Sequence, residues 1–82
     1  MCTYATEKLE ISGSGKGASG WFALDTATVY WDHPAHHQAE HTLNIDFLNL
    51  GAGPGARVAV ELTAESARQL AAAIEVALSR TT

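Results

Sequence analysis

Basic side chains are scarce in this sequence, which carries 5 Lys and Arg against 9 Asp and Glu, a net charge of −4 with His neutral. A nucleic acid or an anionic membrane surface is bound through a basic face, so the composition argues against both partners. No apolar run approaches the roughly 20 residues of a membrane-spanning helix, and the first four residues lack the pattern of a signal peptide. The single cysteine cannot close an internal disulfide, which fits a reducing compartment. We therefore expect a cytoplasmic protein.

The chain is short but not poor in apolar residues, with 82 residues of which 46% are hydrophobic. This is enough for one domain over residues 1–82 and too little for a second. A domain of this size buries only about 60% of its unfolded surface, so it often gains stability from a second copy or a metal ion. The length thus predicts a homo-oligomer.

Turn residues divide the sequence into four strand-like segments followed by a helix. The strands are predicted at residues 3–11, 21–32, 41–50 and 57–62, separated by a flexible Gly-rich loop at 12–20, a turn at 33–39 and a loop at 51–55. Thr63 is a suitable N-cap for the helix, Glu65 places negative charge in its first turn, and Arg80 lies in its last. One apolar stripe follows the helical period: Ala67, Leu70, Ala71, Ile74, Ala77 and Leu78.

The alternation of side chains along the strands predicts the pairing of the sheet. A register that places Trp31 opposite Leu43 also pairs Val29 with Ile45 and Ala27 with Phe47, and the next hairpin then pairs Ile45 with Val60. Leu9 and Ile11 join the same apolar face, on which Trp21 and Trp31 are both expected to be core residues. The predicted fold is α+β, a four-stranded antiparallel β-meander with one C-terminal helix packed on this face.

The opposite face of the predicted sheet mixes polar and apolar side chains. Tyr30, Asn44 and Glu61 lie in one row across three strands, and Asp46 lies in the next row. Such a surface is typical of an interface or a binding site, and an ordinary solvated face is the plainer alternative. The candidate ligand-binding residues are Tyr30, Asn44, Asp46 and Glu61.

All 4 histidines lie between positions 33 and 41. Neutral imidazole is the commonest metal ligand near neutral pH, and a hairpin can bring several of them together. His33 and His41 fall opposite each other at the mouth of the turn, His36 and His37 lie within it, and Cys2 is a further possible ligand. The spacing matches no established metal motif, so histidines that serve only the structure are an open alternative, as is a histidine that acts as general base beside a carboxylate.

The combination Met-Cys-Thr-Tyr at the start, Gly-Ser-Gly-Lys-Gly before a Trp, Asp-His-Pro, and His-Thr-Leu-Asn-Ile-Asp-Phe resembles a group of actinobacterial proteins of about 80 residues and unknown function. The resemblance covers nearly the whole chain and implies a self-standing protein. It implies no activity, cofactor or catalytic residue.

Two functions of different classes follow from these observations. The first is a small oligomeric protein that binds a divalent transition metal, zinc before others, through His33, His41, His37 and His36, and that acts as a metal-dependent enzyme on a small molecule if one coordination position holds water. The second is a metal-free dimeric module that binds a small molecule, or assists another protein, through the polar sheet face.

Overall fold

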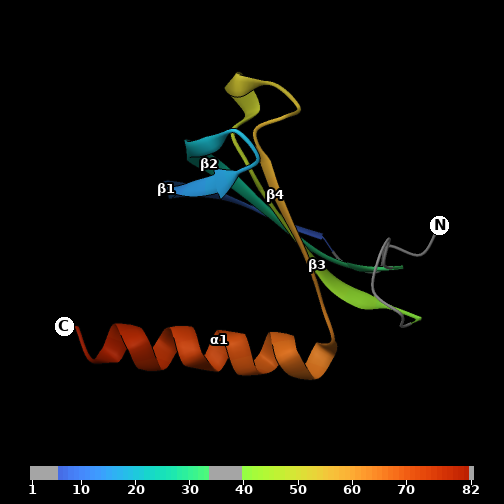
Figure 1. Ribbon diagram of the computed structural model, residues 1–82. Helices are drawn as coiled ribbons and strands as arrows, with labels where there is room; N and C mark the ends of the chain where they lie inside the picture. Colours follow the sequence, from blue (N-terminus) through green and yellow to red (C-terminus); the bar gives the residue numbers. More distant parts are fainter. Residues whose placement is uncertain (1–5, 34–39, 82) are drawn as a thin grey trace.

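The computed structural model describes residues 6–33 and 40–81 and contains one antiparallel sheet and one long helix (Figure 1). The sheet has the strand order β1-β2-β3-β4, so each strand pairs with its neighbour in sequence. The predicted α+β meander with a C-terminal helix is confirmed. The elements are β1 (Thr6–Gly17), β2 (Gly20–Asp32), β3 (Thr42–Leu48), a 3-10 turn η1 (Leu50–Ala52), β4 (Arg57–Leu62) and α1 (Ala64–Ser79).

The predicted register of the central hairpins is confirmed. Trp31 pairs with Leu43, Val29 with Ile45 and Ala27 with Phe47. Ile45 in turn pairs with Val60. A slip by one residue would move every apolar side chain to the other face of the sheet, so the period-two pattern is sufficient to fix this pairing.

The prediction of a flexible loop over residues 12–20 is wrong, because β1 continues through the glycines to Gly17 and only Ala18 and Ser19 form the turn. Pairing with β2 explains the difference. A Cβ on Gly15 would lie 3.1 Å from Leu24 Cδ1, and one on Gly17 would lie 3.1 Å from Phe22 Cε1. Large side chains of β2 therefore cover the bare backbone of β1, which stabilises glycine in a strand.

The expectation that Trp21 belongs to the core is also wrong, since its exposed fraction is 70%. The register of β1 against β2 shifts between Glu10 and Gly13, and such a bulge increases the local twist of the sheet. Beyond this bulge Leu24, which alternation assigns to the opposite face, lines a hollow together with Phe47 and Val58. The pairing of β2 with β3 ends at Thr26–Leu48, so Trp21 lies on the part of β2 that pairs with β1 alone and is left uncovered.

One residue, Thr63, joins the sheet to the helix. Its backbone is extended and its side chain accepts a hydrogen bond from the Ser66 amide, as predicted for the N-cap. From this junction α1 runs back beneath the sheet (Figure 1). It lies over the apolar face and contacts β3 and β4.

The buried core of the described residues is small. Its apolar members are Ala27 and Ala56, and the largest fully buried side chain is Thr42. The apolar stripe of α1 remains open to solvent, with exposed fractions of 44% for Leu70 and 50% for Ile74. The helix thus lies over the sheet, but its apolar stripe is only partly buried against it.

Candidate functional site

His33 and His41 lie side by side at the end of the β2–β3 hairpin, one position beyond the Asp32–Thr42 pair. Their ring centroids are 4.5 Å apart and their planes differ by 25°, and the His41 ring also stacks on Trp31 at 6.0 Å and 15°. The three rings form an aromatic stack at this end of the sheet. The sequence-based prediction that the two histidines meet at the mouth of the turn is thus correct.

Backbone contacts orient the first of these histidines. The Nδ1–H of His33 donates to the Glu40 carbonyl oxygen at 2.8 Å, and the His33 amide donates to Asp32 Oδ1 at 2.8 Å. A backbone carbonyl on Nδ1 fixes the tautomer in which Nε2 carries the lone pair. His41 Nδ1 lies 3.9 Å from an oxygen of the Glu40 carboxylate.

The stacked orientation bears on metal binding. Ring lone pairs lie in the ring plane, so two nearly parallel imidazoles direct them side by side and not toward one point. Coordination of a single ion by both residues therefore requires one ring to turn about its Cβ–Cγ bond. Among residues 6–33 and 40–81 no group of three or more His, Cys, Asp or Glu side chains could hold a metal ion. The predicted ligands His36 and His37, and Cys2, lie outside the described residues.

The polar sheet face contains a connected network in place of an open surface. Tyr30 Oη donates to Asp46 Oδ2 at 3.1 Å, and Arg57 donates to Asp46 Oδ1 from Nη2 at 2.8 Å and from Nε at 3.1 Å. Asn44 is 7% exposed, and its register partners on the neighbouring strands are Tyr30 and Glu61, as the predicted row requires. Both carboxylate oxygens of Asp46 are thus engaged within the protein.

Two residues of this face were missing from the predicted ligand-binding set. Thr42 is fully buried and its hydroxyl donates to Asn44 Oδ1 at 2.6 Å. Arg57 reaches Asp46 on the diagonal, since Ala59 and not Arg57 lies directly opposite Asp46. Strand parity places Thr42 on the face of Asn44, and the diagonal neighbour of an acidic residue is a reasonable place to look for its partner.

This network changes the acidity of Tyr30. Burial is the largest cause that raises the pKa of Tyr30 above its usual value of 10.0, and the hydrogen bond to Asp46 and the negative charge of Asp46 raise it further. The hydrogen bond with Asn44 and the positive charge of Arg57 lower this pKa. A raised phenol pKa favours the neutral folded state. The contribution of this pKa shift to the stability of the fold is complete below the pKa of Tyr30 in the unfolded chain, about 10. It is lost as the pH rises through the pKa of Tyr30 in the folded protein.

Asp46→Asn is expected to lower the pKa of Tyr30, because the substitution removes the negative charge and leaves the positive charge of Arg57 uncompensated. Titration of tyrosinate absorbance measures the shift, and Tyr30→Phe identifies the signal against that of Tyr4. An unchanged pKa in Asp46→Asn would mean that burial alone accounts for the effect.

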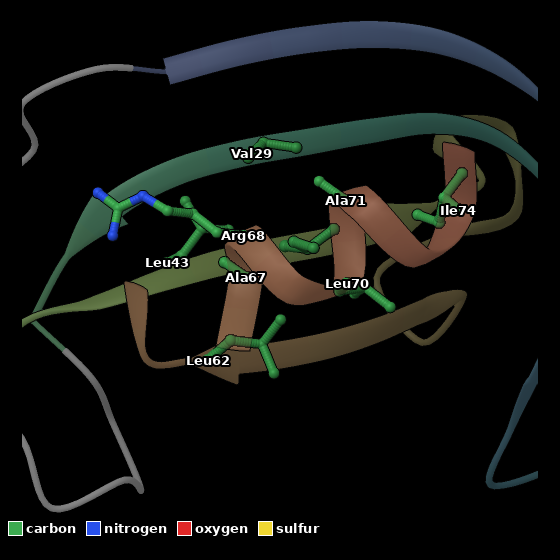
Figure 2. Close-up of a pocket in the computed structure, with 9 residues that line it drawn as sticks. Val29, Leu43, Leu62, Ala67, Arg68, Leu70, Ala71 and Ile74 are labelled. Carbon is green, nitrogen blue, oxygen red and sulfur yellow. The ribbon is translucent and has the colours of Figure 1, made fainter. Parts of the chain in front are cut away.

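An apolar groove of about 330 Å³ lies between α1 and the sheet (Figure 2). Leu43 and Arg68 lie at one end of it and Ile74 at the other. A smaller hollow continues from the Arg68 end to Trp31, which belongs to the histidine stack. The lining of the groove comes from both layers: Val29, Leu43, Ile45, Leu62, Ala67, Arg68, Leu70, Ala71 and Ile74.

Comparison with known proteins places the chain in a family without assigning it an activity. The model of a family of unknown function, DUF6295, matches residues 1–82. The chain belongs to DUF6295. No curated protein and no solved structure matches the chain significantly. Along residues 6–33 and 40–81 this DUF6295 member has no helix of the length and apolar character needed to cross a membrane.

Proposed function

We propose that this DUF6295 protein is a cytoplasmic homo-oligomer that binds a divalent transition metal, zinc before others, through its histidine hairpin. The observation that carries the proposal is the juxtaposition of His33 and His41, with ring centroids 4.5 Å apart. The carbonyl on His33 Nδ1 is the kind of outer contact that metal-ligating histidines make, and it directs coordination to Nε2. The actinobacterial source is inferred from sequence resemblance alone.

The remaining ligands in this proposal come from His36 and His37, which the sequence places between the described pair. Imidazole ligands suit zinc, and they also suit copper, nickel and iron. If one position of the ion were open to water, the metal would supply Lewis-acid chemistry suited to hydrolysis of a small molecule.

The metal-free alternative, a ligand site on the polar sheet face, has less support. A ligand there would compete with Arg57 and Tyr30 for Asp46, so binding would have to break a network that is already satisfied.

Elemental analysis of untagged protein, purified without chelators and again after addition of zinc, tests the proposal. We expect close to one metal ion per chain or per dimer. Protein that holds no metal even after dialysis against excess zinc would contradict the proposal, and ligand searches would then turn to the polar face.

A further inference from the structure

The apolar groove and the helix beside it lack a cover within one chain. Among residues 6–33 and 40–81 no Leu, Ile, Val or Phe is fully buried: those on the apolar face of the sheet are half-buried, and the fully buried apolar residues are two alanines. Burial of large apolar side chains is the main favourable term in folding. On α1, however, Leu70, Ile74 and Leu78 remain 44%, 50% and 55% exposed in a single copy, so this part of the term is unused.

The overall dimensions agree with this reading. The chain exposes 6008 Å² of accessible surface, whereas a compact monomer of 8.7 kDa exposes about 4,700 Å². Its radius of gyration is 13.7 Å, against about 11.7 Å for a compact domain of this length. The excess surface of about 1,300 Å² refers to the whole chain. It exceeds the roughly 800 Å² that one partner loses in a standard complex, so the area available is sufficient for a stable homodimer.

From these observations we infer that the groove between α1 and the sheet is the interface with a second copy of this chain, and that the α1 helix of each copy covers the groove of the other. The inference concerns the homo-oligomeric part of the proposed function and requires no metal. It moves the expected interface from the polar sheet face to the apolar one.

The helix has the features that such an interface requires. Ala67 and Ala71 are small and lie one turn apart on the groove side, which allows close approach of a second helix, while Leu70 and Ile74 supply the large side chains that fill the groove. A two-fold axis makes both contacts identical and closes the assembly at two copies.

Charge complementarity favours an antiparallel pair of helices. Arg68 and Glu75 are both exposed and lie seven positions apart, so they share one side of α1. A two-fold axis between Ala71 and Ala72 places Arg68 beside the partner's Glu75, and the same pair forms again across the axis. The acidic chain thus has no like-charge contact at the centre of this interface.

Sedimentation equilibrium and native mass spectrometry test the inference directly. Wild-type protein at micromolar concentration is expected to have twice the chain mass of 8.7 kDa. Wild-type protein of single chain mass would overturn the inference. If such a monomer also binds an apolar dye, the occupant of the groove is a small apolar molecule instead.

A matched pair of substitutions identifies the face. Ile74 and Val76 are both 50% exposed, but they lie about 200° apart around the helix. Ile74→Glu is expected to raise the dissociation constant of the dimer about 100-fold or more, since each dimer would bury two unpaired carboxylates. Val76→Glu is expected to leave it unchanged. Equal effects of the two variants, or none from Ile74→Glu, would refute the inference.

A charge exchange covers the case in which Ile74→Glu fails to fold. Arg68→Glu is expected to weaken the dimer by placing like charges together, and Arg68→Glu combined with Glu75→Arg is expected to restore it. Both positions are solvent-exposed in one chain, so folding of the monomer does not depend on them. A dimer indifferent to both variants would contradict the antiparallel interface. Zinc binding by the histidine hairpin, measured on the same samples, reports separately on the proposed function.

Discussion

His41→Ala is expected to lower the affinity of the protein for zinc by about 100-fold or more. Loss of a group that merely orients a ligand costs 10- to about 100-fold in affinity, so loss of a ligand should reach at least the upper end of that range. Zinc at about 100 times its dissociation constant should stabilise wild-type protein by about 2.7 kcal/mol. The variant at the same zinc concentration should gain at most about 0.4 kcal/mol. Calorimetric titration and thermal unfolding with and without zinc measure both effects.

A control variant distinguishes the packing of the His41 ring from metal coordination by the ring nitrogens. His41 stacks between His33 and Trp31, so alanine also removes packing. His41→Phe keeps an aromatic ring in the stack but cannot coordinate. We expect His41→Phe to retain most of the zinc-free stability and to lose zinc binding. Zinc binding at wild-type strength in His41→Phe would show that His41 belongs to the structure and not to a metal site.

Thr42→Val is expected to destabilise the protein by about 1–3 kcal/mol, although valine has nearly the same shape as threonine. Thr42 is fully buried and its hydroxyl donates to Asn44 Oδ1. No buried side-chain oxygen or nitrogen in the described part of the chain lacks a hydrogen-bond partner. The substitution would leave the Asn44 oxygen short of its donor in a buried place, and an unpaired buried acceptor carries this cost.

Two further variants test that explanation. Thr42→Ser keeps the hydroxyl and is expected to cost less than Thr42→Val. Thr42→Val combined with Asn44→Leu removes donor and acceptor together, and is expected to recover part of the loss. Urea unfolding at one protein concentration gives the free energies. A change within about 0.5 kcal/mol for Thr42→Val would place it among ordinary surface substitutions and contradict the role of the buried pair.

The sequence predicts those parts of the fold that obey a period. Alternation over Val29, Trp31 and Ile45 sets the register of three strands, and the helical stripe with its Thr63 cap sets α1. The path of residues 12–17 could not be read in this way, because glycine carries no side chain and Phe22 and Leu24 of the partner strand decide it. Trp21 was misplaced because it lies beyond the end of the β2–β3 pairing, which alternation along one strand does not reveal.

In the candidate site, too, only the features that follow from a sequence period could be predicted. The meeting of His33 and His41 depends on the register alone and is therefore predictable. The direction of their lone pairs depends on side-chain rotation, which spacing does not reveal. The Tyr30–Asp46–Arg57 network and the groove arise from diagonal contacts and from the distance between helix and sheet, and neither leaves a periodic signal.

The outer strand β1 has a consequence for solubility. An exposed strand edge offers unpaired backbone groups to any other edge, and open sheets can add to one another without limit. β1 carries Glu7, Lys8 and Glu10 along its exposed length, followed by the bulge before Gly13. Charges and a bulge are the features that keep sheet edges from joining. We therefore expect the charges and the bulge of this glycine-rich outer strand to oppose fibril growth at this edge.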